Sequence, residues 1–423
     1  MTMHAVRLEC AGAAVTVVSA DRSVCRWVGR YFGTWWNAAE VDAASVCAGP
    51  LVTAIVDRGE YDTVAFAVTQ APHTSTSYAR AQMLLARDAS AGVIRAASPE
   101  RGLAYWSEPS AGTVDVIGQD AASVATATAR LAREVMRGAL LRDGWAVLHA
   151  SAVVKNGRTL LTFGGKGAGK TTTAIALAAR HQFGLLANDR VFVGPNSAGG
   201  VTVLPWPSAA AVGLGLLKAL GWFEIARERL QSGDALHPTQ DQRVTDAILA
   251  GNRSPLWERG KELKAQLWPH QFTSWFGVPL ATEGEAAALL FPRIEAGTGP
   301  TAEDADRCLG DADFMSGQPR TATPTFSGSW VSTGAAAKQR AGKSHSAWAA
   351  CPVTRWSSGT MSQRTPISSQ RSPAVSYAGS TQVPRLWSGH SRAHAPPRLL
   401  GPNRASEAAA RQACRSPRAQ RTA

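Results

Sequence analysis

The segment that most constrains the fold is residues 164–171, which read GGKGAGKT and fit the pattern G-x-x-x-x-G-K-[ST]. Glycines at this spacing permit positive φ angles, so that several backbone N–H groups can point inward at one anion. An apolar run at 159–163 precedes the segment and an alanine-rich run at 170–181 follows it. The sequence therefore predicts a strand, a phosphate-binding loop and a helix in that order. The alternative is a glycine-rich turn with no ligand.

A triphosphate held by such a loop uses both backbone and side chains. Lys170 is expected to bridge the β- and γ-phosphates, the Thr171 hydroxyl is expected to be a Mg²⁺ ligand, and the helix start adds partial positive charge. We therefore expect the cofactors ATP and Mg²⁺. The residues predicted to bind the nucleotide are Gly164, Gly165, Lys166, Gly167, Ala168, Gly169, Lys170, Thr171 and Thr172.

A second candidate for the metal is Asp189, which follows the apolar residues Leu185, Leu186 and Ala187. A carboxylate at the end of a strand beside the loop suits a Walker B role, in which it holds Mg²⁺ through water. The chain between the loop and Asp189 is long enough for one crossover helix. The competing interpretation is an aspartate that only forms a turn after a strand.

The region 1–143 contains no catalytic pattern and is predicted to be a small α+β accessory domain. Runs rich in β-branched residues predict strands at 13–18, 51–56, 62–68 and 112–117. Apolar residues at helical spacing predict helices at 23–32 and 121–142. The pair Trp35 and Trp36 could mark a partner surface, although burial is the simpler interpretation.

The region 144–296 is predicted to be the nucleotide-binding domain. A hairpin-like pair of strands should lead into the loop, and strands are expected at 183–193, 262–268 and 287–294. Helices are expected at 209–230 and 271–276.

The region 297–423 is dominated by Ser, Arg, Ala, Pro and Thr and shows no sustained periodicity. Such a composition cannot bury enough apolar surface to offset chain entropy, so a disordered basic tail is predicted. The abrupt change of composition near 311–315 motivates a second hypothesis, that this stretch is the product of a frameshift. The DNA sequence would distinguish the two.

The formal net charge of +13 does not indicate a basic domain. Residues 316–423 carry fifteen of the 44 Lys and Arg residues and one of the 31 acidic residues, so the remainder is close to neutral. A nucleic-acid partner is therefore not expected, and a binding module that acts through the tail ranks last among the alternatives. No apolar run is long enough for a membrane helix and the start shows no secretory pattern, so we expect a cytoplasmic protein. Six scattered cysteines are expected to be free thiols: Cys10, Cys25, Cys47, Cys308, Cys351 and Cys414.

The residues 148–172 followed by 185–193 resemble the HPr kinase/phosphorylase-like family of P-loop proteins, which is related to ATP-dependent phosphoenolpyruvate carboxykinases. The resemblance is specific over 148–193 and extends to 295 only in the order of elements. It implies an α/β, P-loop NTPase-type core of the HPr kinase and carboxykinase-like kind. It also implies transfer of a phosphoryl group to a serine of a peptide or small protein, and it is compatible with a homo-oligomer.

Carried over to this chain, the resemblance gives His149 as the strand histidine near the active site and Asp189 as the second of two paired acids. The first acid, the expected catalytic base, is replaced here by Asn188. An amide cannot accept the serine proton as a carboxylate does, but it can orient a nucleophile. His149, Asn188, Asp189 and Lys170 are thus the candidate catalytic residues. The leading hypothesis is a serine kinase, and the alternative is an ATP-binding regulator or ATPase without protein-kinase activity.

Overall fold

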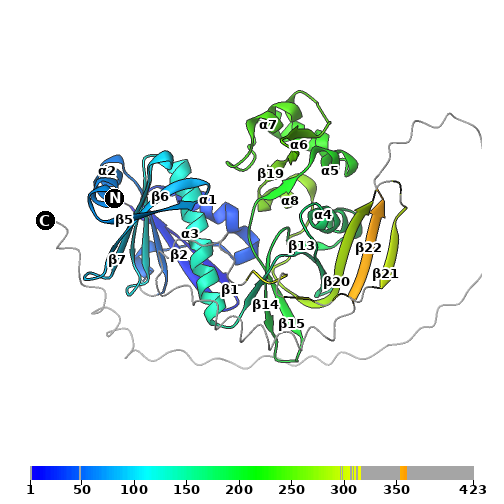
Figure 1. The fold of residues 1–423 in the computed structure, drawn as a ribbon, viewed down its shortest axis with the longest axis horizontal. Coiled ribbons are helices and arrows are strands. Elements are labelled where there is room, and N and C mark those ends of the chain that lie inside the picture. Colours follow the sequence, from blue (N-terminus) through cyan, green and yellow to red (C-terminus); the bar gives the residue numbers. More distant parts are fainter. Residues whose placement is uncertain are drawn as a thin grey trace, which may run out of the picture. The chain divides into compact units, whose positions relative to one another are not determined.

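The computed structural model describes residues 2–46, 49–295, 297, 299–303, 307, 309–310 and 313–315, and the backbone of 304 and 353–359. The described residues belong to one compact unit, residues 1–360. Several sheets are combined with helices (Figure 1), so the predicted mixed α/β fold is confirmed. No helix of the described residues has the length and apolar character needed to cross a membrane.

The first sheet has nine strands in the order β3-β1-β2-β4-β9-β8-β7-β6-β5. The predicted strands at 13–18, 51–56 and 112–117 correspond to three of them. The bounds are β1 His4–Cys10, β2 Ala13–Ser19, β3 Ala39–Val41, β4 Leu51–Val56, β5 His73–Tyr78, β6 Ala81–Asp88, β7 Val93–Ser98, β8 Leu103–Glu108 and β9 Thr113–Gly118.

The strand predicted at 62–68 is wrong, because these residues lie in helix α2 (Arg58–Gln70). The Asp57 side chain accepts a hydrogen bond from Glu60 N at 2.8 Å and so caps the helix start. Tyr61, Val64 and Val68 are buried at helical spacing, which outweighs the β-propensity of the segment.

Two further helices cover this sheet and match their predicted ranges. Helix α3 (Ala121–Arg142) begins at Asp120, whose side chain accepts from Ser123 N, and it packs on β2, β4 and β9. Helix α1 (Arg22–Phe32) packs on α3. Three short 3-10 turns complete the region: η1 Gly33–Trp36, η2 Ala43–Ser45 and η3 Pro99–Arg101.

The second sheet has the strand order β10-β14-β15-β20-β12-β11-β13, and two further strands extend it, since β22 pairs with β20 and β21 pairs with β22. The predicted hairpin is the β11–β12 pair, whose turn uses Asn156 at φ 52° and Gly157 at φ 75°. The bounds are β10 Ala146–Leu148, β11 Ser151–Lys155, β12 Arg158–Thr162, β13 Gly184–Ala187, β14 Val191–Pro195, β15 Val201–Pro205, β20 Gly284–Glu295, β21 Thr301–Asp304 and β22 Val353–Gly359.

Between these strands lie helix α4 (Lys170–His181), at its predicted position, and a group of short elements. The single strand predicted at 183–193 is divided into β13 and β14, and the helix predicted at 209–230 begins with a strand. The short elements are β16 Ala210–Val212, α5 Leu214–Ala219, α6 Trp222–Gln231, α7 Gln242–Leu249, β17 Leu256–Glu258, β18 Lys261–Leu263, β19 Ala265–Leu267 and α8 Pro269–Phe276.

The hydrophobic core crosses the domain boundary predicted near residue 143. Trp35 and Trp36 are buried, as predicted, and their indole N–H groups donate to the carbonyl oxygens of Leu185 (3.2 Å) and Pro205 (3.1 Å). Two side chains of the first region are therefore anchored on strands of the second.

The second sheet also extends past residue 296. Strands β21 and β22 pair with each other and β22 pairs with β20, while Met315 N donates to the Val147 carbonyl at 2.9 Å. The prediction of disorder from 297 onward is therefore wrong for 301–304, 313–315 and 353–359. It rested on local composition, which does not reveal a distant strand partner. The remaining residues of 316–423 lie outside the described part, as do Cys47, Cys308, Cys351 and Cys414.

The two cysteines in the described residues, Cys10 and Cys25, are free thiols, as predicted. Burial, with smaller contributions from nearby acids, raises the pKa of Cys10 to about 12 and that of Cys25 to about 11. Thiols with such raised pKa values are poor nucleophiles at neutral pH.

Candidate functional site

The strand directions bring the predicted site residues to one edge of the second sheet. Strands β12 and β13 both pair antiparallel with β11, which lies between them. They therefore run in the same direction and end at the same edge, where β11 begins. The 164–171 loop follows β12, Asn188 and Asp189 follow β13, and His149 lies just before β11.

The 164–171 loop has the backbone that its glycines predict. Gly164, Gly167 and Gly169 have φ angles of 145°, 87° and 99°. A Cβ atom on Gly164 would lie 2.7 Å from Ala168 Cβ, so the turn excludes a side chain there. Helix α4 begins directly after Gly169 with no side-chain cap. The free N–H groups and partial positive charge at this helix start are suited to an anion.

Lys170 folds back into the loop. Its Nζ donates to the carbonyl oxygens of Gly164 (2.7 Å) and Gly165 (3.3 Å), and the residue is buried. Burial lowers the pKa of Lys170, and the charge on Asp189 opposes that shift. The ammonium group is thus held against carbonyl oxygens of the loop, while two other predicted contacts, Lys166 of the loop and Thr172 of α4, are exposed.

Asp189 joins two basic side chains. Its Oδ1 lies 3.1 Å from His149 Nε2 and its Oδ2 lies 3.3 Å from Arg190 Nε. Burial alone would raise the pKa of Asp189, but the His149 hydrogen bond and the charges on Arg190, His149 and Lys170 lower it overall. An ionised carboxylate can only accept, so His149 donates its Nε2–H to Asp189, and in the neutral form of the ring Nδ1 is then the acceptor.

Asn188 is buried, and both groups of its amide have protein partners. Its Oδ1 accepts from Ser208 Oγ at 3.0 Å and its Nδ2 donates to the Ala209 carbonyl at 3.3 Å. Its backbone carbonyl accepts from Ser151 Oγ at 2.6 Å and from Thr171 Oγ1 at 3.2 Å. Asn188 therefore links β13, β11 and helix α4, and its amide is not available as a free group.

The donor set fits Mg²⁺ carried by a nucleotide better than an independent metal site. The predicted metal ligands, Thr171 and Asp189, contribute one hydroxyl and one carboxylate. Across the part of the chain that the structure describes, no group of three or more His, Cys, Asp or Glu side chains comes together. Mg²⁺ typically takes one or two carboxylates and completes its shell with substrate phosphates and water.

Sequence reasoning missed two residues that organise this edge, Ser151 and Ser208. Ser208 lies twenty residues from Asn188, and no local pattern connects them. A further tertiary feature is Trp206, whose ring centre lies 5.4 Å from the Arg190 guanidinium and 5.6 Å from that of Arg133 in helix α3. The arginine that pairs with Asp189 therefore shares one indole ring with a second arginine.

Comparisons with known proteins add little to this geometry. No family model matches the sequence, and no curated protein matches it. Among solved structures, the Hpr(Ser) kinase/phosphatase from Coxiella burnetii is similar, with 12% identity and a TM-score of 0.19. The match covers 34% of this chain and 58% of that one, so the chain spans little more than half of its length. At this TM-score the similarity supports no conclusion about this chain.

Proposed function

We propose that the protein binds Mg-ATP at the 164–171 loop and transfers the γ-phosphoryl group to a serine hydroxyl of a peptide or small protein. The observation that carries the proposal is the convergence at one sheet edge of the glycine loop, the uncapped start of α4, the Lys170 ammonium and the Asp189 carboxylate. Glycine N–H groups and a helix start bind phosphate oxygens without regard to the base.

In this proposal each side chain has a distinct task. Lys170 exchanges its bonds to Gly164 and Gly165 for phosphate oxygens, and Arg190 is close enough to Asp189 to balance charge at the same edge. Thr171 and Asp189 would hold Mg²⁺, which neutralises charge on the transferred group. His149 accepts the hydroxyl proton at Nδ1, because Asp189 fixes its other nitrogen as a donor.

In this proposal the catalytic base is His149, whereas the family resemblance places the base at the position of Asn188. Asn188 cannot accept a proton, and its amide is engaged by Ser208 and Ala209. A His149→Gln variant should bind ATP as the parent does but transfer phosphate about 100-fold or more slowly, the usual contribution of a positioned base. Equal losses of ATP affinity and rate would instead place His149 in nucleotide binding.

The experiment that tests the proposal is transfer of labelled γ-phosphate from ATP to serine-containing peptides by purified protein, with Lys170→Ala as the inactive control. Phosphoserine formation that depends on Lys170 is the expected result. If Mg-ATP binds and neither peptide nor water is ever phosphorylated, the kinase proposal is wrong.

A second candidate function is a nucleotide-binding regulator that transfers nothing. The engagement of Asn188 inside the protein favours it, because the position that would carry the expected acid is used for structure. This candidate predicts tight ATP binding that changes the protein's resistance to proteolysis, with no phosphoserine formed. The labelled-phosphate experiment separates the two.

A further inference from the structure

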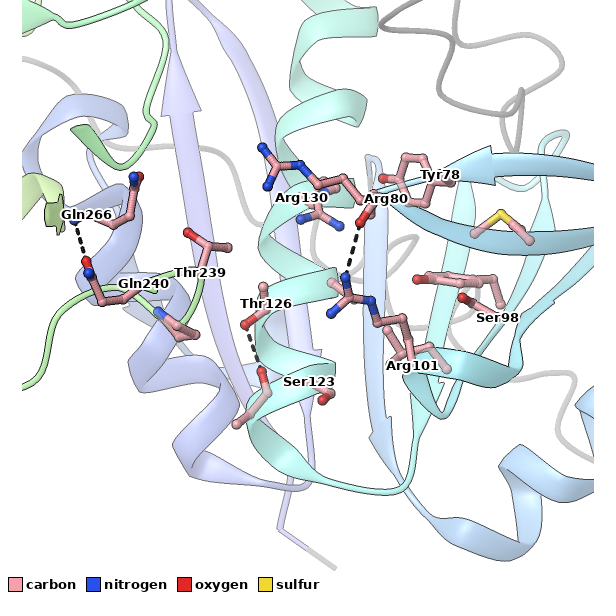
Figure 2. Close-up of a pocket in the computed structure, with 17 residues that line it drawn as sticks. Tyr78, Arg80, Ser98, Arg101, Ser123, Thr126, Arg130, Thr239, Gln240 and Gln266 are labelled. Carbon is pink, nitrogen blue, oxygen red and sulfur yellow. Dashed lines mark hydrogen bonds between the residues drawn. The ribbon is translucent and has the colours of Figure 1, made fainter. Parts of the chain in front are cut away.

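A cavity of about 610 Å³ lies away from the phosphate loop. Its walls come from the β5–β6 turn, η3, β7, β8, helix α3 and the segments around Thr239 and Gln266 (Figure 2). This volume is in the range of ligand pockets. None of the seventeen lining residues is acidic, whereas three of them are arginines: Arg80, Arg101 and Arg130.

The three arginines come from different elements, and two of them, Arg101 and Arg130, act on the same buried tyrosine. Arg101 Nη2 donates to the Ala79 carbonyl at 3.5 Å, and the Arg130 guanidinium lies 5.7 Å from the centre of the Tyr78 ring. Burial raises the pKa of Tyr105 to about 12, and the charges on Arg130 and Arg101 oppose that rise. The charges of Arg130 and Arg101 therefore both act on the buried Tyr105 hydroxyl.

No acidic side chain of the described residues forms an ion pair with Arg80, Arg101 or Arg130. The acid that acts on the neighbouring Tyr78, Glu134, is ion-paired with Arg137 at 3.0 Å. Three cations that line one cavity without a counter-charge leave it electrostatically complementary to an anionic ligand.

Backbone conformation adds an independent observation. Ala79 and Arg80 are the two residues of the β5–β6 hairpin turn, with φ angles of 56° and 65°. Such turns favour Asn and Gly, and a residue with a long side chain is costly there. Unfavourable backbone conformations concentrate at binding sites. The turn holds Arg80 at the cavity despite that cost.

A strand edge adjoins the cavity. Among the described strands β5 pairs only with β6, so its other side presents unpaired N–H and C=O groups. Its residues from His73 to Ser77 are exposed, and it ends at Tyr78, which lines the cavity. A polypeptide can pair with a free strand edge through its backbone, which a small anion cannot do.

We propose that an acidic segment of a polypeptide binds as an added strand on β5 and places its carboxylates against Arg80, Arg101 and Arg130. Where the proposed function holds, this segment belongs to the phosphoryl acceptor, whereas binding of the segment at β5 does not depend on the kinase activity. Ser123 lines the same cavity and can donate its hydroxyl to a carboxylate oxygen, whereas the hydroxyls of Ser98 and Thr126 already donate to the carbonyl oxygens of Gln82 (2.8 Å) and Ala122 (2.9 Å).

The test uses the full-length protein without nucleotide and a short fluorescein-labelled peptide of alternating Glu and Thr. Fluorescence anisotropy should show binding of this peptide, and no binding of a matched peptide with Gln in place of every Glu. An Arg80→Gln/Arg101→Gln double variant should bind about ten-fold or more weakly, because charge-assisted contacts are lost. Arg58→Gln removes an exposed arginine of α2 outside the cavity and should bind as the parent does.

Several outcomes would overturn the proposal. They are equal binding of the Glu and Gln peptides, equal weakening by Arg58→Gln, or undiminished binding of a Glu peptide N-methylated at alternate residues, which cannot pair with a strand. Displacement of the peptide by inorganic phosphate or citrate at equal or lower concentration would assign the cavity to a small anion instead. Thermal melting of each variant confirms folding. Lys170→Ala should retain peptide binding, so failure of the kinase proposal and failure of this one are distinguishable.

Discussion

The 164–171 loop and the cavity lined by Arg80, Arg101 and Arg130 both present positive groups, and they are assembled in different ways. The loop takes its donors from one continuous stretch, 164–171, and uses backbone N–H groups with one lysine. The cavity takes three guanidinium groups from the β5–β6 turn, η3 and helix α3. Backbone donors fix geometry, as a triphosphate requires, whereas long side chains tolerate ligands that differ in shape. The two sites should therefore respond differently to substitution, salt and pH.

The largest expected effect is the loss of ATP affinity at the 164–171 loop when Lys170 is replaced. Replacing it with Ala should lower the affinity for Mg-ATP about 100-fold or more, because one ammonium supplies the charge at the centre of the loop. Titration calorimetry measures the affinity. Lys218→Ala, an exposed lysine of α5, is the matched control and should bind ATP like the parent. Unchanged ATP binding by Lys170→Ala would remove the basis of the phosphate site.

A fall in pH should lower the free energy of unfolding through His237, which lies beside the cavity. Burial, with the charges on Arg133 and Arg130, lowers the pKa of His237 to about 4. Its Nδ1 accepts from Thr239 N at 3.2 Å, and Thr239 lines the cavity.

The unfolded histidine, with a pKa of 6.5, binds a proton that the folded one does not. The contribution of His237 to the free energy of unfolding is therefore constant at neutral pH and falls below pH 6.5, by about 2 kcal/mol at pH 5. In urea denaturation, the free energy of unfolding of His237→Gln should fall by about 2 kcal/mol less than that of the parent between neutral pH and pH 5. His181→Gln, an exposed histidine, is the control, and an unaltered slope in His237→Gln would contradict the assignment.

Substitution of Asn188 tests whether this position serves stability or phosphoryl transfer. Asn188→Asp places a carboxylate oxygen against the Ala209 carbonyl in a buried position, so we expect about 1.5 kcal/mol of lost stability. Chemical denaturation measures it, and Ser208→Ala shows how much the other amide contact contributes. A stable Asn188→Asp variant with increased phosphoryl transfer would show that the position still supports catalysis.

The smallest effect is expected from Gly164→Ala. The new Cβ meets Ala168 Cβ at 2.7 Å in a backbone conformation with φ 145°, so the loop must shift. We expect about ten-fold weaker ATP binding, the equivalent of about 1.4 kcal/mol. Gly215→Ala, in α5 with open space around it, is the control. Unaltered ATP affinity in Gly164→Ala would show that the loop is more tolerant than its geometry indicates.

Elements with a strong local signal were predicted well. Helix α3 and helix α4 match their predicted ranges, because capping, helix propensity and apolar spacing all act within a few residues. Prediction was wrong where packing outweighed propensity, as in helix α2, and where a strand such as β22 finds its partner far along the chain.

The sequence by itself determined the conformation and charge of the 164–171 loop, since its glycine positions and one lysine all lie within eight residues. It also indicated His149 and Asp189 as candidates. Only the tertiary structure decided that His149 and Asp189 are hydrogen-bonded, that the Asn188 amide is engaged by Ser208, and that three distant arginines share one cavity. The physical reason is range. Backbone conformation depends on neighbouring residues, whereas hydrogen-bond partners and electrostatic fields depend on which strands pair.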